Sequence, residues 1–184
     1  MEKNEQPGSK RGRPARRAGS ARPTYAAWIP VLHIEDDEND RELLHTAVLE
    51  AGVPFQVHSV SDAAQAVSYL SGTNEYADRR RFPLPSLILL DLKMPGSSGI
   101  DVLAWVRSST ELDRVSVIIL SGSESEEDMR HAYASGANAY LVKPLGFNAL
   151  VEMIKAINVG WFVSVQNSSP RINFHLGKPS SARP

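Results

Sequence analysis

The sequence predicts an α/β protein with one doubly wound sheet of five parallel strands, in the spatial order 2-1-3-4-5. Short apolar runs alternate with helical patterns five times along the chain, and successive strand–helix units join one sheet through right-handed crossovers. The third run, at 87–90, consists only of Leu and Ile, which is typical of a strand covered by helices on both faces. The order 2-1-3-4-5 is a common arrangement of such a sheet.

The expected strands are the five apolar runs, at residues 31–34, 55–60, 87–90, 115–120 and 139–142. Each is followed by a segment whose apolar residues recur on one helical face. Ser61 or Asp62 is the expected N-cap of the second helix, and Gly52, Gly72 and Gly136 mark the ends of the first, second and fourth. The expected helices cover residues 38–50, 61–72, 98–108, 124–135 and 148–158.

The connection at 73–84 is polar and contains the run Asp78-Arg79-Arg80-Arg81. We therefore expect it to be exposed. Because it is longer than most connections between a helix and a strand, we also expect an extra helical turn or a contact site within it.

Three parts are expected along the chain. Residues 1–27 lack apolar periodicity and carry a basic cluster at 10–17, which predicts a disordered basic arm. Residues 28–160 are the folded domain. Residues 161–184 are expected to be a mostly disordered C-terminal extension, in which the apolar segment 161–165 is an extra strand or a partner-binding segment.

Composition excludes several classes of protein. With 184 residues, 42% of them hydrophobic, and a net charge of −1, the chain can bury one sizeable core. It has no run of about 18 apolar residues and no apolar segment behind its basic N-terminus, which predicts a cytoplasmic protein without a membrane span or signal peptide. The absence of Cys excludes disulfides and thiolate chemistry, and the five scattered His argue against a transition-metal site.

Chemically functional residues follow four of the expected strands. Asp91 follows the third strand, the acidic triplet 35–37 the first, Ser121 the fourth and Lys143 the fifth. Taken alone, Asp91 would be a turn-capping residue, Ser121 part of a Ser-Gly-Ser turn and Lys143 a solvated strand end. Open α/β sheets bind ligands at the carboxyl ends of their strands, so the four together indicate a site.

The residue types at this site predict phosphoryl chemistry with a divalent cation. Glu35, Asp36 and Asp91 would repel one another if crowded without a counter-ion, and oxygen ligands of this kind suit Mg²⁺. Beside a bound metal, Asp91 can act as a nucleophile towards phosphorus and become an aspartyl phosphate. Ser121 and Lys143 would then contact phosphoryl oxygens as a hydroxyl donor and an ammonium charge. The alternative, a solvated acidic turn that opens the first helix, explains Asp37 and Glu38 well but explains the meeting with Asp91 poorly.

These residues resemble the receiver domain of two-component response regulators, which has a flavodoxin-like fold. The resemblance spans residues 30–158 and rests on four motifs: the acidic pair, Asp91-Leu92-Lys93-Met94-Pro95-Gly96, the Ser after the fourth strand, and Lys143-Pro144. The spacings of 30 residues from Asp91 to Ser121 and 22 from Ser121 to Lys143 also match the family.

The resemblance assigns a role to each residue around the metal. It implies that Asp91 is the phosphoacceptor, that Glu35 and Asp36 are metal carboxylates, and that Lys93 supplies a backbone carbonyl to Mg²⁺. The triplet leaves a register question, since Asp37 could replace one of the pair. We choose Glu35 and Asp36 because the family's pair directly follows the strand.

The resemblance also implies a switch. Ser121 and Lys143 would sense the phosphoryl group, and Tyr140 occupies the position of an aromatic ring that moves inward with the hydroxyl. The implied protein is a stand-alone regulator that accepts a phosphoryl group from a sensor histidine kinase and changes its protein contacts, with dimerisation through the fourth helix, fifth strand and fifth helix. It is not an enzyme beyond weak Mg²⁺-dependent autophosphorylation and autodephosphorylation. The long 73–84 connection is similar to that of regulators that partner bacterial phytochrome kinases.

Two other functions are weighed. Arg11-Gly12-Arg13-Pro14 resembles the core of an AT-hook, which binds the minor groove of A/T-rich DNA. The basic arm would then make the protein a DNA-binding regulator, and the competing interpretation is a solubilising tail. A metal-dependent phosphohydrolase using Asp91 would carry a second Asp two residues later, where this chain has Lys93.

Overall fold

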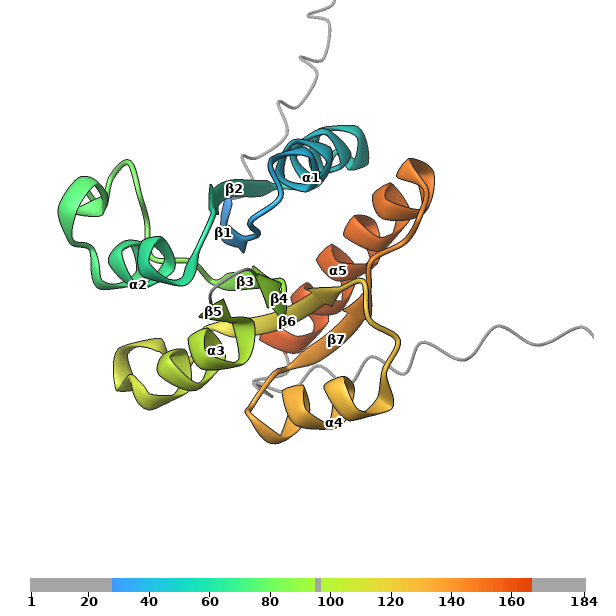
Figure 1. The fold of residues 1–184 in the computed structure, drawn as a ribbon. Coiled ribbons are helices and arrows are strands. Elements are labelled where there is room, and N and C mark those ends of the chain that lie inside the picture. Colours follow the sequence, from blue (N-terminus) through green and yellow to red (C-terminus); the bar gives the residue numbers. More distant parts are fainter. Residues whose placement is uncertain (1–27, 95–96, 167–184) are drawn as a thin grey trace, which may run out of the picture.

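A sheet of five parallel strands forms the centre of the molecule in the computed structural model, which describes residues 28–94 and 97–166 (Figure 1). Its strand order is β2-β1-β3-β6-β7. Counted among the long strands alone, this is the predicted order 2-1-3-4-5, and the predicted doubly wound fold is confirmed. Two further strands of two residues each pair with one another in the connection that follows β3.

The elements follow the sequence pattern closely. The strands are β1 (Ile29–Ile34), β2 (Phe55–Val60), β3 (Leu87–Leu90), β4 (Lys93–Met94), β5 (Ser97–Ser98), β6 (Ser116–Ser121) and β7 (Ala139–Val142). The helices are α1 (Glu38–Ala51), α2 (Ala63–Ser71), α3 (Gly99–Ser108), α4 (Glu126–Ala134) and α5 (Phe147–Gln166), with single 3-10 turns η1 (Asn74–Tyr76) and η2 (Thr110–Leu112).

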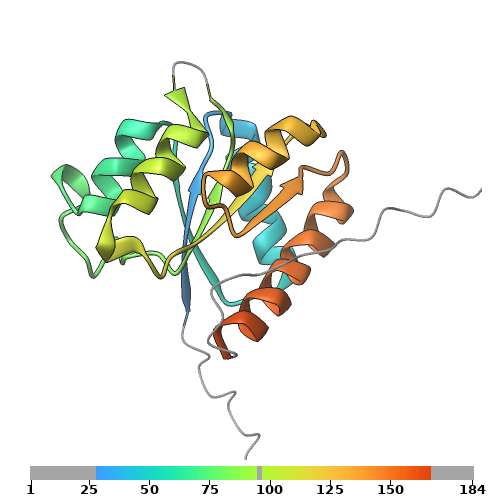
Figure 2. The ribbon, with the colours of Figure 1, turned by 90° about the horizontal axis from the view of Figure 1, so that it is seen from below.

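Helices cover both faces of the sheet. Helices α1 and α5 lie side by side on one face, and α2, α3 and α4 lie on the other (Figure 2). Successive residues of a strand point to opposite faces, so Leu87 and Leu89 of β3 pack in the core beneath α1 and α5. Ile88 and Leu90 pack in the core beneath the other three helices. All four are fully buried, which explains why this strand has no polar alternation.

Side-chain caps fix where the helices begin. Asp62 rather than Ser61 is the N-cap of α2, and its carboxylate accepts from the Gln65 N–H at 2.8 Å. Ser125 caps α4, so this helix starts two residues later than predicted. Gly52 and Gly72 end α1 and α2 with φ values of 63° and 64°, the left-handed conformation that favours glycine after a helix.

The connection between α2 and β3 is more ordered than the sequence predicted. It contains the expected extra turn, η1, but the expectation that it is exposed throughout is wrong. The Tyr76 ring is buried, with its centroid 5.2 Å from that of Tyr69 and 5.1 Å from that of Phe82. These aromatic rings bury enough apolar surface to hold the connection against α2.

Arg79 completes this attachment. Its guanidinium donates to the carbonyl oxygens of Tyr69 at 2.7 Å and Leu70 at 2.6 Å, at the end of α2, and to that of Phe82 at 3.3 Å. The last carbonyls of a helix have no partner within the helix. The guanidinium therefore serves both as a cap for α2 and as a tie to the connection.

Helix α5 is longer than predicted. The segment 161–165, expected to be an extra strand or a partner-binding segment, continues the helix to Gln166, so the strand alternative is wrong. An established helix extends at the cost of one residue per added hydrogen bond, and Gly160 opposes this by only about 1 kcal/mol. The helix crosses the boundary placed at 160. The predicted disordered segments at 1–27 and 168–184 lie outside the described residues.

Across residues 28–94 and 97–166, none of the helices combines the length and hydropathy needed to cross a lipid bilayer.

The role of Arg79 predicts a selective loss of stability. Arg79→Met removes the charged donor and should lower the free energy of unfolding by about 1.5–3 kcal/mol. Chemical denaturation with urea measures this. Arg80→Met is the matched control, because Arg80 is exposed and its side chain has no hydrogen bond among the described residues; it should change stability by less than about 0.5 kcal/mol. Equal losses in the two variants would contradict the assignment.

Candidate functional site

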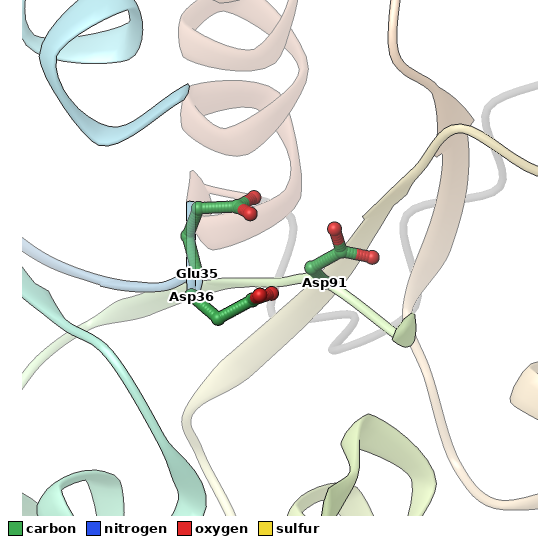
Figure 3. Close-up of side chains that lie close together, drawn as sticks. All are labelled: Glu35, Asp36 and Asp91. Atoms are coloured by element: carbon green, nitrogen blue, oxygen red, sulfur yellow. The ribbon is translucent and has the colours of Figure 1, made fainter. Parts of the chain in front are cut away.

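Three carboxylates meet at the carboxyl edge of the sheet. Strands β1 and β3 are paired so that Ile34 lies opposite Leu90, and the next residues along each strand are Glu35 and Asp91. One carboxylate oxygen each from Glu35, Asp36 and Asp91 lie within 4.8 Å of one another (Figure 3). Glu35 and Asp91 are buried. This point lies between β1 and β3, where the order of the strands reverses and open α/β sheets bind ligands.

Asp37 takes a different role from its two neighbours. Its carboxylate accepts from the N–H groups of Asn39 at 2.7 Å and Asp40 at 3.2 Å and caps α1. These bonds to backbone N–H groups hold the pKa of Asp37 below its usual value. The cap accounts for the third acid of the triplet, and only Glu35 and Asp36 join Asp91.

The Lys143 ammonium lies among three carboxylates. It donates to Glu35 Oε2 at 2.5 Å, to Asp91 Oδ2 at 2.8 Å and to Asp40 Oδ2 at 2.8 Å. Burial alone would lower the pKa of Lys143, but its hydrogen bonds to Asp40, Asp91 and Glu35 raise it above the ordinary value for lysine. The lysine therefore stays charged. Asp40, which the sequence pattern does not indicate, projects from the first turn of α1.

Excess negative charge remains despite this lysine. Burial raises the pKa of Glu35, and the neighbouring Asp91 adds to the increase, although the hydrogen bond from Lys143 opposes it. A group of hard oxygen ligands that crowd one another in this way suits a divalent cation such as Mg²⁺, which takes carboxylates and keeps several waters. The residues present thus fit the divalent metal that the sequence predicts.

The chain after β3 wraps around Asp91. The Lys93 N–H donates to Asp91 Oδ1 at 3.0 Å, while the Lys93 side chain is exposed. Gly99 lies against the start of this turn, where a Cβ atom would approach the Asp91 carbonyl oxygen to 2.2 Å. No side chain fits there without moving the backbone that carries Asp91.

Ser121 and Tyr140 lie on β6 and β7, which follow β3 on the side of the sheet order away from β1. Ser121 is fully buried at the end of β6, and its Oγ accepts from the Ser123 N–H at 3.3 Å. Tyr140, on the neighbouring β7, is buried, and its hydroxyl donates to the Ser123 carbonyl at 2.9 Å. Both predicted switch residues therefore contact the same residue, Ser123, which sequence analysis did not single out.

A buried histidine lies beneath the carboxylates. His33 Nε2 is 4.0 Å from Glu35 Oε2, and His33 Nδ1 is 3.5 Å from Ser59 Oγ, which contacts His45 at 2.9 Å. Burial and the nearby Lys143 lower the pKa of His33 to about 3, so the imidazole is neutral. A neutral buried imidazole has no sequence signal that distinguishes it from an ordinary strand residue.

A cavity of about 410 Å³ borders the site on its α1 side. Glu35, Asp40 and Lys143 contribute its polar wall, and Leu43 and Leu145 are apolar lining residues that remain solvent-exposed. An apolar surface beside a charged centre offers a partner protein something to bury.

These observations define a class of protein. It is a doubly wound α/β protein with an acidic, lysine-containing site at the switch point of its sheet. Residues 31–155 match the family model of the response regulator receiver domain. The chain is 30% identical over 135 residues to the response regulator Rcp1 of Synechocystis sp., which covers 73% of this chain and 90% of Rcp1.

Solved structures agree with this match. Response regulator RPA3017, in red light signaling of R. palustris, has a TM-score of 0.67 and 37% identity, covering 70% of this chain and 90% of its own. The phosphorylated cyanobacterial phytochrome response regulator RcpA has a TM-score of 0.67 and 34% identity, covering 75% and 96%. The Mn²⁺-bound form of Rcp1 has a TM-score of 0.63 and 29% identity, covering 72% and 94%.

This chain belongs to the response regulator receiver family. Membership implies a phosphoacceptor role in two-component signalling and a divalent cation in the acidic pocket.

The close approach of Gly99 to Asp91 predicts a strict requirement for glycine. Gly99→Ala should lower the free energy of unfolding by about 1–3 kcal/mol, because the added methyl group must displace backbone. Urea denaturation measures the loss. In the control, Gly122→Ala, the new Cβ meets nothing within 4 Å, and stability should fall by less than about 0.5 kcal/mol. A stable Gly99→Ala protein would show that the turn has room to spare.

Proposed function

We propose that this protein is a stand-alone response regulator that accepts a phosphoryl group on Asp91 from a sensor histidine kinase. The observation that carries the proposal is the position of Asp91. Its carboxylate lies close to the acids Glu35 and Asp36, which can hold a cation, and accepts a hydrogen bond from the Lys143 ammonium at 2.8 Å. A carboxylate next to a bound cation and an ammonium group can approach the negatively charged oxygens of a phosphoryl donor.

The transfer forms one bond to phosphorus and breaks one. A carboxylate oxygen of Asp91 forms a bond to phosphorus as the bond between phosphorus and the donor's imidazole nitrogen breaks, and that nitrogen keeps the electron pair. Lys143 exchanges its hydrogen bond with Asp91 Oδ2 for one to a phosphoryl oxygen, and Ser121 donates its hydroxyl to another. Positioning and charge neutralisation do most of the work in such transfers. Weak autophosphorylation and autodephosphorylation would be the only enzymatic activities.

Mg²⁺ is the proposed cation. Glu35, Asp36 and Asp91 would hold it through carboxylate oxygens, and Lys93 through its backbone carbonyl. When bound, Mg²⁺ supplies positive charge against the incoming phosphoryl oxygens.

The partner we propose is a kinase of the phytochrome type, acting in the cytoplasm. The resemblance to RcpA and to RPA3017 supports this choice. The exposed Leu43 and Leu145 beside the cavity offer an apolar surface near Asp91, where a kinase must dock to deliver its phosphoryl group.

The output we propose is a change in protein contacts. Ser121 and Tyr140 would respond to the phosphoryl group and alter the surface of α4, β7 and α5, through which two copies would dimerise. We propose residues 28–160 as the receiver domain, with 1–27 and 161–184 as appendages. The DNA-binding alternative depends on Arg11-Gly12-Arg13-Pro14, outside the described residues, and no contact in the described part of the chain favours it.

The phosphoacceptor assignment is tested by intact mass spectrometry of the full chain after incubation with acetyl phosphate. We expect addition of one phosphoryl group in Mg²⁺, and none in EDTA or in Asp91→Asn. Asp101→Asn, which neutralises an exposed acid in the first turn of α3, should be modified like the unaltered protein. Modification of Asp91→Asn to the same extent would refute the assignment.

The metal assignment is tested by thermal unfolding with increasing Mg²⁺. A ligand that binds only the folded state stabilises it by about 2.7 kcal/mol at a hundred times its Kd, so the Tm should rise. Asp36→Asn should reduce this rise. Asp37→Asn keeps an acceptor oxygen for the α1 N-cap and should leave the Mg²⁺-dependent rise intact. A rise that both variants reduce would mean that the metal pair is Asp36 and Asp37.

A further inference from the structure

Ser123 joins the two residues of the proposed switch. Its N–H donates to Ser121 Oγ at 3.3 Å, and its carbonyl accepts from the Tyr140 hydroxyl at 2.9 Å. Any movement of Ser123 therefore changes the surroundings of the buried hydroxyl and of the tyrosine together. What fixes Ser123 decides where Tyr140 rests.

The Ser123 side chain is fixed by Asp128. Ser123 Oγ donates to Asp128 Oδ2 at 2.5 Å, a separation typical of a hydroxyl bound to an ionised carboxylate. Ser123 Oγ also accepts from the Ser125 N–H at 3.3 Å. This hydroxyl thus acts both as a donor and as an acceptor. Its two bonds connect the loop between β6 and α4 to the first turn of α4.

Asp128 is itself held by helix α4. It lies in the first turn, where the Ser125 hydroxyl accepts from the Asp128 N–H at 3.4 Å. The positive end of the helix dipole favours a carboxylate at this place. A movement of the start of α4 would therefore move Ser123 as well, because the Asp128 carboxylate connects the two.

The same carboxylate faces the phosphoacceptor turn. Lys93 Nζ is 4.0 Å from Asp128 Oδ2, and the Lys93 N–H is bonded to Asp91. Because both side chains are substantially exposed, this ion pair contributes little to stability. It nevertheless places Asp128 where the turn after Asp91 and the loop after Ser121 come together.

We propose that Asp128 is the positioning residue that holds Ser123, and through it keeps the Tyr140 ring in the buried position seen in this structure. It acts through a hydrogen bond to a neighbouring loop and makes no contact with Asp91. The inference deepens the proposed function, because the importance of Tyr140 rests on that function; the position of Tyr140 does not.

The test uses ¹⁹F NMR of the full chain labelled with 3-fluorotyrosine, without any phosphodonor. The resonances are assigned by Tyr→Phe variants. Asp128→Ala should move the Tyr140 resonance towards its frequency in denatured protein, with the ratio of inward to outward rings falling about tenfold or more. Asp128→Asn keeps an acceptor oxygen and should restore much of the shift. Ser123→Ala removes the same bond together with the one from the Ser125 N–H, so it should move the Tyr140 resonance at least as far. Adding Asp128→Ala to Ser123→Ala should then change it little, because the bond between the two side chains is already lost.

The controls separate this role from folding and from charge. Tyr69 and Tyr76 lie in the aromatic cluster beside α2, so their unchanged resonances report an intact fold. Glu127→Ala removes an exposed charge from the same helical turn and should leave Tyr140 unmoved. If Asp128→Ala disturbs the reference resonances, Ser123→Ala decides the question.

A Tyr140 resonance that stays in place in both Asp128→Ala and Ser123→Ala, or that moves as far in Glu127→Ala, overturns the proposal. Failure of phosphorylation at Asp91 would leave this result standing, so the two ideas fail separately.

Discussion

The Lys143 ammonium among Glu35, Asp40 and Asp91 is the interaction on which the rest of the site depends. Carboxylates buried at the end of a strand are costly unless an opposite charge and hydrogen bonds compensate them. The lysine supplies both, with bonds of 2.5 to 2.8 Å to three acids. It leaves the acids in excess, so the arrangement that compensates the buried carboxylates also fits them for a divalent cation.

This arrangement was predictable because it follows from topology. Residues that directly follow parallel strands must meet at one edge, so the positions of Asp91 and Lys143 behind apolar runs were sufficient to place them together. Asp40 and His33 could not be predicted in the same way. Asp40 reaches the lysine from a helix, at a distance set by how α1 packs, and His33 occupies a strand position that otherwise looks ordinary.

The errors in the predicted fold also arise from contacts and neighbours that the local sequence does not show. Residues 73–84 are polar on average. Nevertheless, the ring of Tyr76 and the guanidinium of Arg79 attach them to α2, because the contacts of two side chains are enough to fix the position of a short connection. Residues 161–165 are apolar enough for a strand, but they follow directly on a helix that is already formed. Local composition indicates which structure a segment favours. Its tertiary contacts, as in 73–84, or the element it continues, as in 161–165, decide which structure forms.

The site combines rigid and adjustable parts. Asp91 follows a strand buried on both faces, and Gly99 packs against its carbonyl, so the backbone of Asp91 cannot move far. Ser123, by contrast, lies in a loop between β6 and α4 and is held by hydrogen bonds to Ser121, Tyr140 and Asp128. A phosphoryl group on Asp91, as proposed, would act on a fixed backbone on one side and on this set of hydrogen bonds on the other. The loop and the start of α4 would then respond while the sheet stays in place.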